Sequence, residues 1–340
     1  MNTAWRSIVP GSKQEAVEKA LRQAFGSSFL RDILLLQGGL SSALVYRIVS
    51  GKRTYVLRII MQTDTLNDPV RQFACMQTAA EAGIAPQVRY ANAEDAVSIT
   101  DYIAPYDLVS HFSSQHALLS ELVRTIRAIH ALPLFAPLVD FMDGVDVFIQ
   151  YFRQLNMLPE EATAEHFRYY AEIQRAYPRH ETGLVSSHND LNPNNILFDG
   201  KKIWVIDWET AFRNDRYVDL AIIGKSFVHT HSQEEHFLRK YFGDALSDYN
   251  RARYFLMQQV CHIYYATIML RQAAAIKPDD FTHEKSMKTP SMHTFNRLKK
   301  DNKISLSSYE GKLLYGKILL NEALYNMKTA RFASAIQAIS

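Results

Sequence analysis

The sequence predicts an α+β fold of two lobes, in which an antiparallel sheet with a helix precedes a mostly helical C-terminal part. Three observations indicate this. Short apolar runs separated by turn residues fill residues 34–100, as expected for neighbouring strands. From residue 107 onward, apolar residues recur with helical spacing. One hairpin pattern, over residues 196–206, interrupts these helices.

Length and composition agree with two lobes. The chain has 340 residues, more than one typical domain, and 47% of them are hydrophobic, which is enough for a large core. We place the boundary near Pro105. The N-terminal lobe is then residues 1–105 and the helical lobe is residues 106–340.

The N-terminal lobe is expected to begin with a helix over residues 13–25, followed by three strands. Residues 34–48 predict a strand, a turn rich in glycine and serine, and a second strand, and residues 54–59 predict the third. Backbone at glycine can approach a phosphate group closely, and serine hydroxyls can donate hydrogen bonds to it. The candidate phosphate-binding residues of the turn are Gly38, Gly39, Ser41 and Ser42.

A helix with clear end signals follows the third strand. Asp68 is a good N-cap, Pro69 suits the first turn, and Gly83 suits the C-terminal end. A pair of strands over residues 87–90 and 96–100 then completes the lobe.

The C-terminal lobe is expected to contain helices over residues 117–131, 251–271 and 307–339. His130, near the end of the first of these, is expected to be a packed or capping histidine and not a ligand. Residues 276–303 are rich in polar residues and have sparse apolar periodicity. They predict a long exposed loop or mobile insertion between two helices.

The most informative stretch is residues 187–209. A polar loop with Asp190 and Asn195 is followed by an apolar strand, an Asp-Gly turn, a second apolar strand and then Asp207. In such a hairpin, the loop before the first strand and the residue after the second strand lie at the same end. The three side chains are therefore expected to converge.

These three side chains suit phosphoryl transfer. Transfer of a γ-phosphoryl group needs Mg²⁺ held by carboxylate or amide oxygens, and a carboxylate that orients the attacking hydroxyl and accepts its proton. Asn195 and Asp207 suit the metal, and Asp190 suits the hydroxyl. Asp and Asn are also common turn residues, but here several residue types and spacings must match at once.

The same residues resemble the catalytic region of the aminoglycoside phosphotransferase and choline kinase superfamily, whose members are relatives of the protein kinases. The matching runs are His188-x-Asp190-x-x-x-x-Asn195, Ile206-Asp207-Trp208-Glu209, and D-x-x-x-D-L-A at residues 215–221. The first two runs are most similar to the choline and ethanolamine kinases. Protein kinases fit less well, because Trp-Glu instead of Phe-Gly follows the aspartate of the second run.

The resemblance implies a protein-kinase-like two-lobe fold, with ATP and Mg²⁺ as cofactors. It implies that Asp190 is the catalytic carboxylate, in a loop whose His188 and Asn195 also belong to the catalytic machinery. It further implies that Asn195 and Asp207 hold the metal.

Two other regions match the nucleotide side of the superfamily. Arg58 occupies the place of the third-strand lysine that meets the α- and β-phosphates. The segment with Asp101 and Ile103 matches the hinge whose backbone pairs with adenine. In kinases the helix after the third strand offers a glutamate to that cation, but here Gln72 aligns with it. Arg58 then lacks an obvious acidic partner unless Glu81 or another acid substitutes.

The resemblance favours a small-molecule hydroxyl acceptor of the choline or ethanolamine type. A methylated ammonium group has no hydrogen-bond donors, so aromatic rings and a carboxylate must recognise it. The candidates are Trp208, Glu209, Tyr254, Tyr264 and Tyr265. The tyrosines could equally be packing residues of their helix.

Other functions stay open at this point. An aminoglycoside or a thiamine-type compound is the alternative acceptor, and the first of these calls for a cluster of carboxylates. The helical lobe offers Asp140, Asp143, Asp146, Glu160 and Glu161. A nucleotide-binding pseudokinase that acts as a binding protein is the non-enzyme alternative, because Arg58 and Gln72 replace the usual Lys and Glu.

Charge and cysteine content exclude several classes of protein. The net charge is only +3 with both signs interspersed, so no nucleic acid is expected as a partner. Cys75 and Cys261 lie within apolar helical patterns, which favours a reducing compartment over a disulfide framework. We expect neither a signal peptide nor a membrane span, and a cytoplasmic location.

Overall fold

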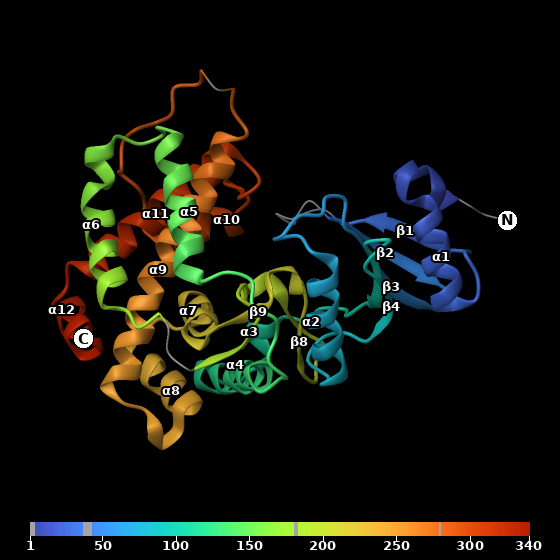
Figure 1. Ribbon diagram of the computed structural model, residues 1–340, viewed down its shortest axis with the longest axis horizontal. Helices are drawn as coiled ribbons and strands as arrows, with labels where there is room; N and C mark the ends of the chain where they lie inside the picture. Colours follow the sequence, from blue (N-terminus) through green and yellow to red (C-terminus); the bar gives the residue numbers. More distant parts are fainter. Residues whose placement is uncertain (1–3, 37–42, 180–182, 279) are drawn as a thin grey trace. The chain divides into compact units, whose positions relative to one another are not determined.

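The structure of the protein is a computed structural model, and it describes residues 4–36, 43–179, 183–278 and 280–340 (Figure 1). The chain forms two compact units, which are treated separately below. The first consists of Met1–Leu138, Leu184–Asp219 and Ser226–Tyr241, and the second of Val139–Gly183, Leu220–Lys225 and Phe242–Ser340. The predicted lobe boundary near Pro105 lies inside the first unit and stays a prediction.

The first unit contains the predicted antiparallel sheet. Its strands are β1 (Asp32–Leu35), β2 (Leu44–Ser50), β3 (Arg53–Ile59), β4 (Val88–Asn92) and β5 (Val97–Asp101). They pair in the order β1-β2-β3-β5-β4, and every pairing is antiparallel. The central strand β3 carries Arg58, which is paired with Val45 on one side and with Ser98 on the other.

Two helices belong to this sheet, as predicted. Helix α1 (Gln14–Phe25) contributes Val17 and Leu21 to a core that includes Leu57 and Ile99 of the sheet. Helix α2 (Pro69–Glu81) begins where expected, because the Asp68 side chain accepts hydrogen bonds from two backbone amides of the first turn.

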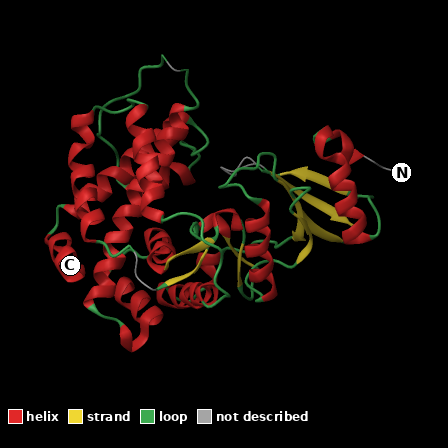
Figure 2. Ribbon diagram, in the orientation of Figure 1, coloured by secondary structure: helices red, strands yellow, loops and turns green. Residues whose placement is uncertain are grey.

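The rest of the first unit contains two small sheets (Figure 2). Strand β6 (Leu184–Ser187) pairs with β9 (Phe212–Asp215), and β7 (Ile196–Phe198) pairs with β8 (Ile203–Val205), which is the predicted hairpin. Helices α3 (Leu108–His111), α4 (Gln115–His130) and α8 (His231–Phe242) accompany them, and α7 (Arg216–Phe227) contributes residues to both units.

The described part of the second unit is made of helices and loops (Figure 2). The helices are α5 (Phe141–Gln154), α6 (Glu160–Ala176), α9 (Asp248–Ala274), α10 (Met292–Lys300), α11 (Tyr309–Met327) and α12 (Ala330–Ile339). Helices α9 and α11 approach closely at Gly316, where an added Cβ would meet Leu270 at 2.7 Å. None of the helices in the described residues is long and apolar enough to cross a membrane.

The prediction of a long exposed loop over residues 276–303 is wrong for its second half. Met292–Lys300 forms α10, whose N-terminus is capped by Ser291. Phe295 of this helix is fully buried and stacks on Tyr315 with ring centroids 5.3 Å apart. One buried aromatic residue in a polar segment is too sparse a pattern to reveal a helical period.

Candidate active site

The hairpin brings the predicted catalytic residues to one end, as its geometry requires. Ile206, directly after β8, donates its backbone N–H to the carbonyl oxygen of Asn195 over 3.0 Å. Asp207 follows directly with φ of 64° and ψ of 62°, a left-handed conformation that Asp tolerates better than most residues. Asn195 and Asp207 are therefore neighbours across the base of the hairpin.

Asp190 is held by two asparagine side chains of its own loop. The Asn195 Nδ2 donates to the backbone oxygen of Asp190 at 2.9 Å and to its Oδ2 at 3.1 Å. Asn192 Nδ2 donates to the same Oδ2 at 3.0 Å. These bonds leave the amide oxygen of Asn195 as the atom suited to a metal, and they orient a carboxylate that can accept a proton.

A buried aspartate anchors the start of this loop. Asp219 is completely buried, and it accepts hydrogen bonds from the backbone N–H groups of His188 at 3.0 Å and Asn189 at 2.7 Å. His130 Nε2 lies 3.1 Å from the same carboxylate. Burial alone would raise the pKa of Asp219, but the contacts with His130 and the His188 backbone hold it below its usual value.

The anchoring role of Asp219 was not predicted from the sequence. The signal that could have found it is the D-x-x-x-D-L-A run, where the second aspartate precedes a buried helical stretch. His130 agrees with the expectation of a packed histidine, since it also bonds Tyr241 at 2.6 Å.

His188 packs beneath the residues that flank Asp207. Its side chain is fully buried, its Nε2 lies 2.9 Å from the carbonyl oxygen of Ile206, and its ring contacts the edge of Trp208 at 4.8 Å between centroids. This position suits a residue that orients the end of β8 and does not contact substrate. Trp208 is only 4% exposed, which favours packing over the predicted contact with an acceptor.

Arg58 has acidic partners that helix α2 does not supply. Its Nη1 donates to Asp207 Oδ1 at 2.7 Å, and its Nη2 donates to the carboxylate of Glu209. Burial disfavours the charged guanidinium, but these two carboxylates outweigh it and hold the pKa of Arg58 above its usual value. Gln72 is buried in α2, and Glu81 is exposed.

The donor set at the hairpin base fits Mg²⁺. Asn195, Asp207 and Glu209 offer amide and carboxylate oxygens, which are the ligands that this ion prefers. Among the described residues, no group of three or more His, Cys, Asp or Glu side chains could hold a metal alone. A magnesium ion here would therefore use one or two protein oxygens together with phosphate oxygens and water, as is usual at nucleotide sites.

The predicted nucleotide side is described only in part. Gly38, Gly39, Ser41 and Ser42 lie outside the described residues. The carboxylate of Asp101, at the end of β5, pairs with Arg89, with both hydrogen bonds at 2.7 Å. Ile103 lies in the extended segment that follows. The assignment of Asp101 and Ile103 to adenine recognition stays a prediction that concerns their backbone.

The predicted acceptor tyrosines belong to the second unit, on helix α9. Tyr254 is fully buried, and its hydroxyl lies so close to Gly224 that a Cβ there would be 2.0 Å away, which favours a packing role. Tyr264 makes edge contacts with Phe141 at 5.2 Å and Phe148 at 5.3 Å between centroids.

The ring of Tyr265 already has a cation on its face. The Nζ of Lys225 lies 3.9 Å from the ring centroid, and the same Nζ lies 3.5 Å from the hydroxyl of Tyr315. Tyr265 is partly exposed. The cation-π contact of this ring is therefore made within the second unit, and the assignment of Tyr265 to the acceptor stays a prediction.

The acids considered for an aminoglycoside are mostly engaged within the second unit. Arg179 pairs with Asp140 at 2.7 Å and with Asp143. Asp146 accepts hydrogen bonds from Tyr170 at 2.8 Å and from Gln174. Glu160 and Glu161 are exposed in the first turn of α6, where their negative charges interact favourably with the helix dipole.

Comparisons with known proteins identify the family and the fold of the chain. The sequence model of the phosphotransferase enzyme family matches residues 32–255, which include the sheet, Arg58 and the whole catalytic hairpin. LicA from Haemophilus influenzae is 25% identical over 240 residues, which are 66% of this chain and 66% of LicA. The chain thus spans about two thirds of the length of this curated relative.

Solved structures share the fold. A choline/ethanolamine kinase family protein from Mesorhizobium loti is similar with a TM-score of 0.67 and 20% identity, over 96% of this chain and 99% of that one. A spectinomycin phosphotransferase, in complex with ADP and spectinomycin, has a TM-score of 0.55 and 13% identity, over 89% of this chain and 98% of that one. The predicted kinase-like α+β fold is confirmed.

Proposed function

The chain belongs to the phosphotransferase enzyme family, and on this premise we propose that it transfers the γ-phosphoryl group of ATP to a hydroxyl group of a small molecule. The observation that carries this proposal is the arrangement around Asp207. That residue is tied to Arg58 of the sheet and adjoins Asn195, which in turn holds Asp190.

Each of these side chains has a role that its position supports. Arg58 supplies a fixed positive charge for the α- and β-phosphates, and its planar guanidinium can contact two oxygens at once. Asp190 accepts the proton of the acceptor hydroxyl as that oxygen attacks phosphorus. Asn195 orients Asp190 through the hydrogen bonds of its amide nitrogen.

Buried hydrogen bonds hold the loop of Asp190 and the segment before Asp207 in place. Asp219 fixes the backbone of His188 and Asn189, so Asp190 starts from a defined position. His188 fixes the carbonyl of Ile206, so Asp207 also starts from a defined position. A bound Mg²⁺, held by Asn195 and Asp207, would neutralise charge on the phosphate oxygens.

The proposed acceptor is an amino alcohol of the choline or ethanolamine type. The structure from Mesorhizobium loti bears the name of the choline/ethanolamine kinase family and covers nearly all of this chain. Tyr265 supports the proposal because its ring already makes a cation-π contact with the ammonium group of Lys225, the kind of contact that a cationic acceptor would need. Glu209 adds a carboxylate close to the proposed metal ligand Asp207.

An aminoglycoside acceptor has less support. The solved spectinomycin phosphotransferase shares the fold, but Asp140, Asp143 and Asp146 are committed to contacts within the second unit. A polycationic ligand would have to displace Arg179 to reach two of them.

The test is a panel of acceptors. Purified protein is incubated with ATP and Mg²⁺ and with choline, ethanolamine, thiamine or an aminoglycoside, and ATP consumption is followed by a coupled assay. We expect consumption that depends on choline or ethanolamine and is lost in Asp190→Asn. Nucleotide binding without turnover for any acceptor would instead support a pseudokinase that acts as a binding protein.

A further inference from the structure

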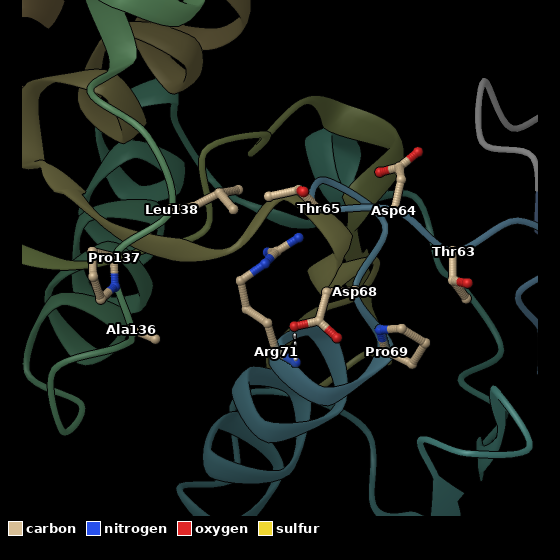
Figure 3. Close-up of a pocket in the computed structure, with 9 residues that line it drawn as sticks. All are labelled: Thr63, Asp64, Thr65, Asp68, Pro69, Arg71, Ala136, Pro137 and Leu138. Carbon is tan, nitrogen blue, oxygen red and sulfur yellow. Dashed lines mark hydrogen bonds between the residues drawn. The ribbon is translucent and has the colours of Figure 1, made fainter.

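Helix α2 carries a buried arginine that the reaction described above does not use. Arg71 is only 7% exposed, although arginine is rarely buried without partners. Its side chain rises from the first turns of α2, between the segment that carries Thr63–Asp68 and the segment that carries Ala136–Leu138 (Figure 3). These segments line a cavity of about 420 Å³ beside the side chain.

The guanidinium of Arg71 binds backbone oxygens, not carboxylates. Its Nη1 donates to the carbonyl oxygen of Ala211 at 2.6 Å, and its Nη2 donates to the carbonyl oxygens of Glu209 at 2.9 Å and Leu66 at 2.5 Å. Cys75, one turn further along α2, points its sulfur at the same Ala211 oxygen at 3.6 Å. Helix α2 is thereby fastened to residues 209–211.

The fastened segment is the one that bears the charged groups of the site. Glu209 is its first residue, Asp207 lies two residues before it, and both carboxylates contact Arg58 of β3. A chain of contacts therefore runs from α2 through Arg71 to the Glu209 backbone, and from the Glu209 carboxylate to Arg58. Charge-assisted hydrogen bonds of this kind are among the stronger ones in proteins, and a planar guanidinium restricts their geometry.

We propose that Arg71 is a positioning residue for phosphoryl transfer, which holds the Glu209–Ala211 backbone so that Asp207 and Glu209 face the metal and Arg58. In this arrangement, α2 controls the site through the backbone of the segment after β8. A direct ion pair from α2 to the β3 cation is not needed, which accounts for a buried Gln72 at the position that the sequence aligns with a glutamate. The proposal rests on the proposed roles of Asp207 and Glu209.

Calorimetric titration of ATP, with Mg²⁺ and with EDTA, tests this in the wild type, Arg71→Met and Arg71→Lys. Arg71→Met keeps the length of the apolar stem but donates no hydrogen bonds. We expect it to weaken Mg-ATP binding by on the order of tenfold to a hundredfold, and metal-free ATP binding by about twofold or less. The Mg-ATP affinity of Arg71→Lys should lie between those of the wild type and Arg71→Met, because one ammonium group cannot reach all three carbonyl oxygens that the guanidinium contacts.

The matched control is Arg22→Met, which removes an exposed arginine of α1. Within the described residues, the ion pair of this side chain is with Glu18. It should leave both titrations unchanged. A steady-state comparison adds a second readout: Arg71→Lys should raise the Mg²⁺ concentration needed for half-maximal rate, a shift that a loss of overall stability would not produce.

Two results would overturn the proposal. Arg71→Met could bind Mg-ATP as tightly as the wild type. Arg71→Lys and Arg71→Met could weaken ATP binding equally with and without Mg²⁺, which would indicate a general structural role. If the wild type itself binds no Mg-ATP, the proposed function fails first. Wild-type binding that is lost in Asp207→Ala but kept in Arg71→Met would contradict the positioning role alone.

Discussion

Arg58 Nη1 lies 2.7 Å from Asp207 Oδ1, although the two residues are 149 positions apart in the chain. The pair joins the sheet to the hairpin and places the proposed phosphate-binding cation against a proposed metal ligand. A magnesium ion held by Asp207 would share this carboxylate with Arg58. Nucleotide phosphates can relieve this sharing, because they offer Arg58 new anionic partners while they contribute ligands to the metal.

Asp190→Asn should abolish phosphoryl transfer and leave nucleotide binding largely intact. Asparagine keeps the shape and the contacts with Asn192 and Asn195 but cannot accept the hydroxyl proton. We expect a rate at least about a hundredfold lower, measured by ATP consumption, with a calorimetric Kd for Mg-ATP within about threefold of the wild type. A variant that turns over within a few-fold of the wild type would rule out Asp190 as the base.

Asp207→Ala should weaken Mg-ATP binding more than Asn195→Ala does. The first substitution removes a charged ligand, and the second removes a neutral amide oxygen. Asp207→Ala should also free Arg58 from one of its two carboxylates, so metal-free ATP binding should be unchanged or slightly tighter. Titrations that show no change for Asp207→Ala would remove this residue from the metal site.

Tyr265→Leu should raise the KM for choline by a few-fold to about thirtyfold, since a cation-π contact contributes on the order of 0.5 to 2 kcal/mol. Lys225→Met should do the opposite and lower this KM, because the competing ammonium on the ring is removed. Asp143→Ala serves as the comparison and should have little effect. A larger increase in KM for Asp143→Ala than for Tyr265→Leu, which becomes smaller as the salt concentration rises, would indicate a polycationic acceptor.

Much of this site could be predicted from the sequence because its signals are local. Asp190, Asn195 and Asp207 belong to one hairpin with a strong turn signal, so their convergence follows from strand geometry. The start of α2 at Pro69 follows likewise from the Asp68 cap.

The partners of Arg58 could not be predicted in the same way. An ion pair across 149 residues depends on how the sheet meets the hairpin, and no local pattern encodes that arrangement. Arg71 was missed for a related reason, since its partners are backbone oxygens that every residue possesses. Trp208 was assigned to the acceptor because it adjoins Asp207, but neighbours in sequence can face opposite sides, and its ring is buried.

Folding stability should fall below neutral pH, in part because of His262. Burial, followed by the charge of Lys225, lowers the pKa of His262 to about 3 in the folded chain. The unfolded chain binds a proton near pH 6.5 and the folded chain does not, so stability is lost as the pH falls from about 6.5 towards 3. Between pH 7.5 and pH 5.0, this loss should approach about 2 kcal/mol.

The measurement for His262 is the free energy of unfolding in denaturant at both pH values. His262→Leu should lose less stability than the wild type between pH 7.5 and 5.0, and the exposed His293→Leu should behave like the wild type. The nearby Glu322, 4.0 Å from His262, also has a pKa that burial raises. Because Glu322 is present in both proteins, its contribution to the pH dependence cancels to first order in this comparison. Equal losses for His262→Leu and the wild type would contradict the buried neutral histidine.

The central claim is that this chain phosphorylates a small-molecule hydroxyl at the Asp190, Asn195, Asp207 and Arg58 site. Phosphorus NMR of a reaction with ATP, Mg²⁺ and choline or ethanolamine tests it most directly, because it identifies the phosphate ester formed. The account predicts a phosphomonoester of the amino alcohol with the wild type and none with Asp190→Asn or Arg58→Met. A product that persists in Asp190→Asn, or inorganic phosphate as the sole product with every acceptor, would contradict it.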